Sequence, residues 1–301
     1  MKRAAKVCLI IAVILIISGG AVFCAAMQKI GWDFSSFGGG KYVTRTVPVT
    51  GDFQNISVSG DTDDVSFLLS DDGKCRVEFY ESEIRPHDAS VENGTLSVRC
   101  ADTREWYVKF PVVSVETPVI KIYLPRKEYG AVSVRSDTGD VTVPKEFSFE
   151  SVGITTDTGD VDLLASAAGT VRIETDTGDI LCEGVKADEV SLTVNTGKVD
   201  AISVSCGSFA STGDTGDISM KDVIATRTLT VVRGTGDVSF NKCDAGSLSV
   251  ETDTGDVGGS LLTPKVFIAT SDTGSIDVPG SASGGACTVT TDTGDIKLTV
   301  D

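Results

Sequence analysis

Hydrophobic residues recur in fixed columns along the second half of the chain. Counted from each of nine evenly spaced glycines, position −7 is never polar, position −5 is nearly as apolar, and position +2 is always Val or Ile. The inward positions are odd before the glycine and even after it, so two short strands per repeat face one core and the chain bends between them. The glycines at these bends are Gly139, Gly159, Gly178, Gly197, Gly216, Gly236, Gly255, Gly274 and Gly294.

The bend motif is Asp-Thr-Gly-Asp, and its glycines follow one another at intervals of 19 or 20 residues. A short fixed period is typical of a solenoid, in which each coil buries its apolar face against its neighbours. Glycine allows the positive φ of a sharp bend, and the preceding Asp can close an Asx-turn. Residues 131–301 therefore predict an all-β, single-stranded β-solenoid, similar to a parallel β-helix, with nine repeats.

Residues 41–130 carry a weaker copy of the same pattern. Asp61-Thr62-Asp63-Asp64 imitates the motif, and Asp64 precedes Asp140 by 76 residues, which is four periods of 19. Strands are expected at 56–58, 65–69, 76–80, 95–99 and 119–124. The region is either an irregular beginning or cap of the solenoid, or a separate small β domain.

The N-terminus differs from the rest of the chain. Lys2, Arg3 and Lys6 precede the uncharged residues 7–27, a run long enough to cross a bilayer as one transmembrane helix. The basic residues favour a cytoplasmic N-terminus. Residues 1–27 therefore predict a signal anchor and residues 28–40 a tether, which gives a single-pass cell-membrane protein with an extracytoplasmic β body. The alternative is a secreted protein whose signal peptide is cleaved.

The net charge of the chain restricts the kinds of partner it can bind. The 301 residues carry a formal net charge of −17, and 27 Asp and Glu against 11 Lys and Arg after residue 130 supply nearly all of it. Nucleic acid is therefore not a partner. Carboxylates at −2 and +1 of the motif point outward. Solvent screening and turn hydrogen bonds can accommodate them, Ca²⁺ can bind between coils, or a basic partner surface can pair with them. The candidate Ca²⁺ ligands are Asp137, Asp140, Asp157, Asp160, Asp176, Asp179, Asp214, Asp217, Asp253, Asp256, Asp292 and Asp295.

The chain lacks a recognisable catalytic arrangement. Asp272-Thr273-Gly274 matches the triplet of aspartic proteases, but those enzymes bring two triplets together to share a proton, whereas here the triplet recurs at every bend. Residues 131–301 contain no Trp, Tyr or His to form a sugar-binding platform. The single His87 lies beside a proline in a polar stretch and is expected at the surface. We expect a protein that is not an enzyme and has no cofactor other than a possible Ca²⁺.

The cysteines of the repeats do not share one position within the repeat. Cys182, Cys206, Cys243 and Cys287 stand at different distances from their preceding glycines, so each is expected to be a small apolar core residue. Cys75 and Cys100 are the candidates for a disulfide in an exported protein, with their redox state left open.

Three segments carry a resemblance to a known family: residues 51–58 (GDFQNISV), residues 122–125 (IYLP) and the repeated Thr-Gly-Asp-Val/Ile. They resemble the putative-adhesin family of bacterial β-strand-repeat proteins, a domain-of-unknown-function group often found behind one N-terminal membrane span. The resemblance implies an exported β-solenoid. We expect a non-catalytic, adhesin-like or envelope-scaffold protein that contacts the membrane through residues 7–27 and an unknown protein or envelope partner.

Two other functions stay open at this point. One is an envelope-stress or signalling accessory that acts through a membrane partner. The other is a carbohydrate-active β-helix enzyme, since such folds can carry paired carboxylates.

Overall fold

A computed structural model describes residues 2–29, 41–83, 85–100, 117–280 and 283–301. The N-terminal run forms one helix, α1 (Lys2–Lys29). Within these described residues, no helix meets the length and hydropathy expected of a membrane span. The anchor over residues 7–27 therefore stays a prediction, and residues 30–40 of the expected tether lie outside the described part of the chain.

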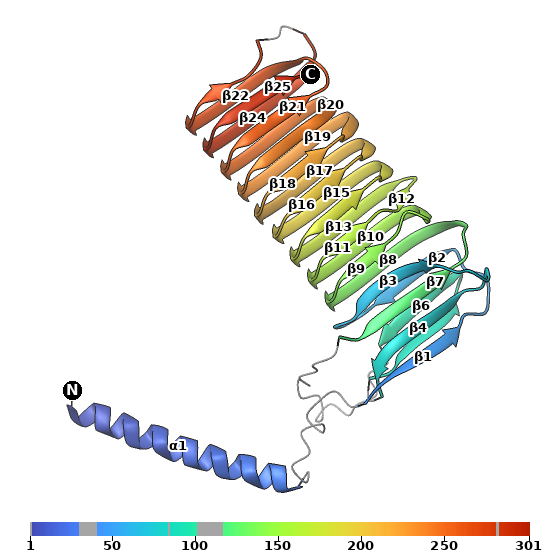
Figure 1. Ribbon diagram of the computed structural model, residues 1–301, viewed down its shortest axis with the longest axis vertical. Helices are drawn as coiled ribbons and strands as arrows, with labels where there is room; N and C mark the ends of the chain where they lie inside the picture. The colour runs from blue at the N-terminus through green and yellow to red at the C-terminus, as the bar shows by residue number, and fades with distance from the viewer. Residues whose placement is uncertain (1, 30–40, 84, 101–116, 281–282) are drawn as a thin grey trace.

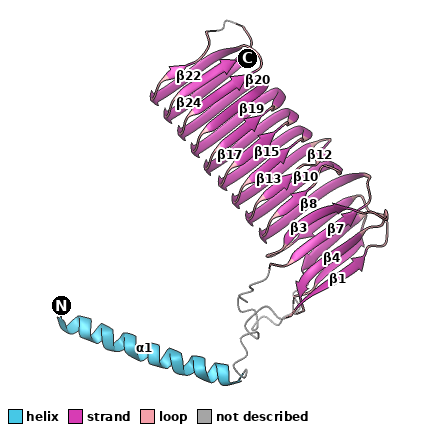
Figure 2. Ribbon diagram, in the orientation of Figure 1, coloured by secondary structure: helices cyan, strands magenta, loops and turns pink. Residues whose placement is uncertain are grey.

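The remaining described chain is an all-β rod (Figures 1 and 2). Parallel strands stack into two sheets, which continue into each other through β20 (Val238–Thr254). The short strands of sheet A are β9 (Val141–Val143), β11 (Val161–Leu163), β14 (Ile180–Glu183), β16 (Val199–Ile202), β18 (Ile218–Lys221), β21 (Val257–Leu261), β23 (Ile276–Asp277) and β25 (Ile296–Val300). Sheet B holds β8 (Glu128–Thr138), β10 (Ser148–Thr158), β12 (Ser166–Ala167), β13 (Thr170–Thr177), β15 (Lys186–Thr196), β17 (Ser205–Thr215), β19 (Ile224–Thr235), β22 (Lys265–Thr273) and β24 (Gly285–Thr293).

The predicted columns are the core of this rod. Equivalent residues pair directly between coils, as in Val152 with Val171 and Val161 with Ile180. Positions −7, −5 and +2 are buried in every repeat except the one at Gly274. Each buried aliphatic side chain stabilises the fold by about 1.5–3 kcal/mol relative to an exposed one, so the stack depends on the column continuing from coil to coil. The β-solenoid prediction is confirmed.

The coils do not stack in sequence order at the C-terminal end. β24 pairs with both β20 and β22, and β25 pairs with both β21 and β23. The last repeat therefore lies inside the stack, between the seventh and eighth. The eighth repeat, which precedes it in the chain, forms the end of the rod (Figure 1).

An equivalent insertion occurs at the N-terminal end. β2 (Asn55–Ser59) lies between β8 and β6 (Thr95–Cys100), while β3 (Asp64–Leu69) pairs with β9 and with β7 (Val119–Leu124). Antiparallel strands then close the end: β4 (Arg76–Ser82) on β7, β5 (His87–Glu92) on β6, and β1 (Tyr42–Pro48) on β4. The N-terminal strands thus extend the two sheets of the repeats, while the exact domain limits stay predictions.

Candidate functional site

Each Thr-Gly-Asp bend is held by contact with the bend of the adjacent coil. The repeat glycines have φ between 130° and 156°, as at Gly216 and Gly255. A side chain at Gly197 would overlap the carbonyl group of Gly178 in the neighbouring coil, and the other repeat glycines are covered in the same way by an adjacent coil. The bend therefore needs glycine both for its backbone conformation and for the close approach of coils.

The carboxylates at +1 have a structural role that the sequence did not reveal. Each accepts a hydrogen bond from the backbone amide at +1 of an adjacent coil, at 2.7–3.0 Å. The row is interrupted at Lys198, whose backbone amide donates such a bond to Asp179 but whose side chain has no carboxylate to continue the row. The donor–acceptor pairs are Asp140–Asp64, Asp160–Asp140, Asp179–Asp160, Lys198–Asp179, Asp237–Asp217, Asp256–Asp237, Asp295–Asp256 and Ser275–Asp295.

The carboxylates at −2 form a second row with different surroundings. Asp176 accepts a hydrogen bond from the Asn195 side chain at 2.9 Å. The other members are exposed, and no side-chain hydrogen bond or ion pair within the described chain engages them. We call this row the acidic stripe, and its unengaged members are Asp137, Asp157, Asp214, Asp253, Asp272 and Asp292.

The predicted calcium ligands thus fall into two classes. Both classes are exposed, but those at +1 each have one oxygen committed to a backbone amide, whereas those at −2 other than Asp176 have no such bond within the described chain. Among the described residues, no group of three or more His, Cys, Asp or Glu side chains is arranged to hold a metal ion. Calcium binding at the bends stays a prediction.

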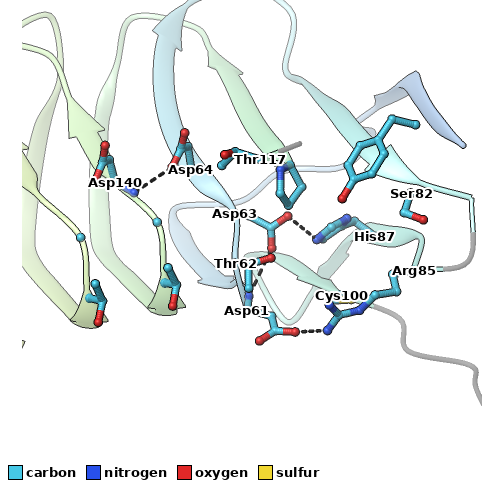
Figure 3. A pocket seen from close by; sticks show the side chains of 16 residues that line it. Asp61, Thr62, Asp63, Asp64, Ser82, Arg85, His87, Cys100, Thr117 and Asp140 are labelled. Atoms are coloured by element: carbon cyan, nitrogen blue, oxygen red, sulfur yellow. Dashed lines mark hydrogen bonds and ion pairs between the residues drawn. The ribbon is translucent and has the colours of Figure 1, made fainter. Parts of the chain in front are cut away.

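A pocket of about 560 Å³ lies where the bends stop, at the N-terminal end of the repeats (Figure 3). The bend residues Gly139 and Gly159 line one side of it, and His87, Arg85 and Asp63 line the other. Asp63 occupies the place of a repeat glycine, because Asp64 hydrogen-bonds with Asp140 as the next +1 residue. The regular Thr-Gly bend thus ends with Asp63, which turns toward His87 (Figure 3).

The expectation that His87 is a surface residue is wrong. It is 6% exposed and stacks on Phe79 with ring centroids 5.3 Å apart. Its Nδ1 lies 2.9 Å from Glu81 Oε2, and its Nε2 lies 3.1 Å from Asp63 Oδ1, an ion-pair distance without hydrogen-bond angles. The sequence placed His87 in a loop because the antiparallel strand β5 could not be identified from its polar residues.

Charge around His87 favours the imidazolium. Burial opposes protonation, but the carboxylates of Asp63 and Glu81 outweigh it and raise the pKa of His87 above its usual value. Arg45 Nε in turn binds Glu81 Oε1 at 2.7 Å, so Glu81 is shared by two cationic groups. Both ring nitrogens face carboxylates and neither is available as a catalytic base. The cluster therefore acts as a clamp that joins the bend before β3 to the antiparallel strands β4 and β5.

Sequence reasoning could have found this site through one signal. Asp61-Thr62-Asp63-Asp64 keeps every residue of the motif except its glycine, which the close stacking of bends requires. A carboxylate at the glycine position means that no further bend stacks on that side. What the sequence could not show is that Glu81 and His87, from two other strands, meet Asp63 there.

The two predictions made for the cysteines have different outcomes. Cys182, Cys206, Cys243 and Cys287 are buried as expected, and burial raises the pKa of the Cys182 thiol to about 12. The other two candidates, Cys75 and Cys100, are not joined by a disulfide.

One buried cation was not expected from the pattern. Arg233 stands at an inward position, is 1% exposed, and donates to the Val194 carbonyl at 3.3 Å and to Ser211 Oγ at 3.2 Å. Its Nε lacks a partner among the described residues. Burial lowers the pKa of Arg233 to about 10. The adjacent coil has Gly213 at the same level, and a side chain there would collide with the guanidinium.

Solved structures similar to the chain share its fold at low sequence identity. A putative adhesin from Bacteroides fragilis superposes with a TM-score of 0.52 at 18% identity, covering 73% of this chain and 97% of its own. Another from Parabacteroides distasonis gives 0.53 at 15% identity, with coverages of 86% and 98%. A third, from Parabacteroides merdae, gives 0.50 at 13% identity, with coverages of 87% and 98%.

Among curated proteins, none matches the chain. The family model described as Toastrack DUF4097 matches residues 53–222 and 206–301, which together include most of the chain and all of its repeats. The chain belongs to the Toastrack DUF4097 family.

Proposed function

We propose that this protein is a non-catalytic, adhesin-like β-solenoid that is anchored in the cell membrane by residues 7–27 and displays its rod outside the cytoplasm. The acidic stripe is its contact surface for a positively charged partner. The observation that carries this proposal is the difference between the two acidic rows. The +1 carboxylates accept hydrogen bonds from the backbone of adjacent coils, whereas the stripe carboxylates other than Asp176 are left unengaged within the described chain.

Electrostatics gives the stripe a preference for cationic surfaces. Carboxylates about 4.8 Å apart in adjacent coils repel each other by about 0.9 kcal/mol per neighbour even at the dielectric constant of water. A basic surface with many positive groups relieves this repulsion along the whole rod. Such binding is fast and sensitive to salt, as contacts between complementary charged surfaces are.

A non-catalytic role agrees with the chemistry of both sites. The bend motif recurs at coil after coil with the same hydrogen-bonding role. In the pocket, the carboxylates of Asp63 and Glu81 occupy both nitrogens of His87, so the imidazole cannot accept a proton from a nucleophile.

Display outside the cytoplasm is tested by adding protease to intact cells that produce the full chain. Degradation of the β rod with retention of α1 supports the anchored topology. Complete protection of the rod in intact cells, with degradation after lysis, contradicts it.

Stripe binding is tested with two variants of equal charge. Both remove four negative charges, and their adsorption to polylysine-coated beads is measured against salt concentration. We expect the stripe variant to lose affinity and to show a shallower salt dependence than the control variant. The stripe variant changes Asp137, Asp157, Asp253 and Asp292 to Asn, and the control changes Glu128, Glu150 and Glu183 to Gln and Asp200 to Asn. Equal losses in both variants would show that net charge alone acts.

A further inference from the structure

The C-terminal end of the rod is an open β edge. In the described chain, β22 pairs only with β24, and β23 pairs only with β25. The amides of Gly274 and Ile276 have no backbone partner within this part of the chain, whereas the equivalent amides of inner coils donate to the next coil. The end coil therefore carries unused strand-pairing groups, which favour the addition of another strand.

The same end exposes apolar side chains. Ile268 is 57% exposed, Ile276 46% and Val266 38%. Ile276 and the partly buried Phe267 stand in core columns, and they are uncovered because no described coil stacks on this side of them. Among the large hydrophobic residues exposed on the described β rod, Val232 and Leu262 lie outside the end coil.

This apolar surface is specific to the end coil. Val266 and Ile268 stand at positions −8 and −6, which point outward. In the other repeats these positions hold Ala, Ser, Gly, Thr, Arg or Glu, as at Thr230 and Thr288. Edge strands are commonly protected from pairing by charged residues. Here the outward positions of the edge carry branched aliphatic residues instead, so the edge favours association.

The other end of the rod shows how such an edge is closed in this molecule. There β4 adds antiparallel to β7 in sheet A, and β5 adds antiparallel to β6 in sheet B. No described strand provides this closure for β22. A second copy related by a two-fold axis would present its own β22 in the antiparallel direction.

We propose that two copies of this protein associate end to end through β22, each supplying the antiparallel strand that the other lacks. The register that continues the core column is centred on Ile268. It places Phe267 opposite Ala269 of the second copy and Ile268 opposite Ile268 of the second copy, so that inward positions meet inward positions and outward positions meet outward positions. Asp272 then faces Pro264 of the second copy, and the two Asp272 carboxylates lie at opposite ends of the pairing.

The size of the contact sets its strength. A nine-residue strand is about 30 Å long, and two packed sheets with their side chains are about 20 Å thick, so the end covers about 600 Å² per copy. The resulting total of about 1,200 Å² lies at the lower limit of specific interfaces. A dimer that forms and dissociates with protein concentration follows, with the two acidic rods pointing away from each other.

The association is measured by sedimentation velocity of the full chain in detergent, over a range of protein concentrations. The test variant Val266→Ser/Ile268→Thr introduces residues that other repeats carry at the same positions, so the coil is expected to fold. The control Val232→Thr removes an exposed apolar residue from the side of the rod, where the preceding repeat has Thr212. We expect the double variant to weaken dimerisation at least about tenfold and the control to leave it unchanged. Helix α1 is common to all three proteins and cannot cause a difference between them.

A crosslink tests the register. With oxidised glutathione added, Ile268→Cys should form a disulfide-linked dimer well above the background of the parent chain, and Val232→Cys should not. A monomer at every concentration overturns the proposal, as does equal weakening by the double variant and the control. Association of β22 with a different protein while the chain itself stays monomeric also overturns it.

Discussion

Replacing Gly197 with Ala should destabilise the middle of the rod far more than an ordinary glycine substitution. Gly197 has φ of 147°, a region that residues with a Cβ rarely adopt. An added Cβ would lie 2.7 Å from the carbonyl carbon of Gly178, closer than real Cβ atoms approach, and would overlap its oxygen. The two coils must therefore move apart at the bend.

The loss can be estimated from the groups that move. Backbone strain at positive φ costs about 1–3 kcal/mol. Separation of the coils weakens the hydrogen bonds from the Gly178 amide to Thr196 and from the Gly197 amide to Thr215, each worth about 0.5–1.5 kcal/mol. A total of about 2–6 kcal/mol corresponds to a fall in Tm of about 4–24 °C for a protein of this size.

Thermal unfolding followed by circular dichroism measures this effect, with Gly184→Ala as the matched control. Gly184 also has positive φ, 69°, but its Cβ would meet no atom within 4 Å. The control should lose only about 1 kcal/mol, the cost of the backbone conformation. If both variants lose the same stability, coil contact is not what requires glycine at the bends.

Three further predictions concern single side chains. Asp160→Asn keeps an acceptor for the Asp179 amide and should leave Tm within about 2 °C of the wild type. Asp160→Ala removes the acceptor and should lower the free energy of unfolding by about 1–2 kcal/mol. Equal losses in the two variants would contradict the hydrogen-bond role of the +1 row. Because the pKa of His87 is raised, its contribution to stability is complete below its unfolded pKa of about 6.5 and is lost as pH rises through the folded pKa. Hydrogen exchange of β4 and β5 should therefore accelerate from about pH 6 to 9 in the wild type, and this added pH dependence should vanish in His87→Gln. Arg233→Met removes a buried charge at similar volume and should be at least as stable as the wild type. Arg233→Ala leaves a cavity and should lower the free energy of unfolding by about 2–4 kcal/mol. A Met variant as unstable as the Ala variant would refute the idea that the buried charge is dispensable.

The sequence by itself determined the structure of each coil, with its two short strands and the bend between them. The change of phase at each glycine, with apolar residues at −7, −5 and +2, can be satisfied only if two short strands share a core and the chain bends between them. This information is local and is repeated nine times, so the bends at Gly139 and Gly255, the strands on either side and the outward acidic rows followed from the pattern alone.

Only the tertiary structure decided the order of the coils and the neighbours of the polar residues. Because every coil presents equivalent columns, the pattern does not distinguish a last repeat at the end of the rod from one inserted beside β20. The same limit hid the clamp at His87, whose partners Asp63 and Glu81 come from separate segments of the chain. It also hid the accommodation of Arg233 opposite Gly213. Periodicity fixes which face a side chain occupies, whereas long-range strand pairing fixes what it meets there.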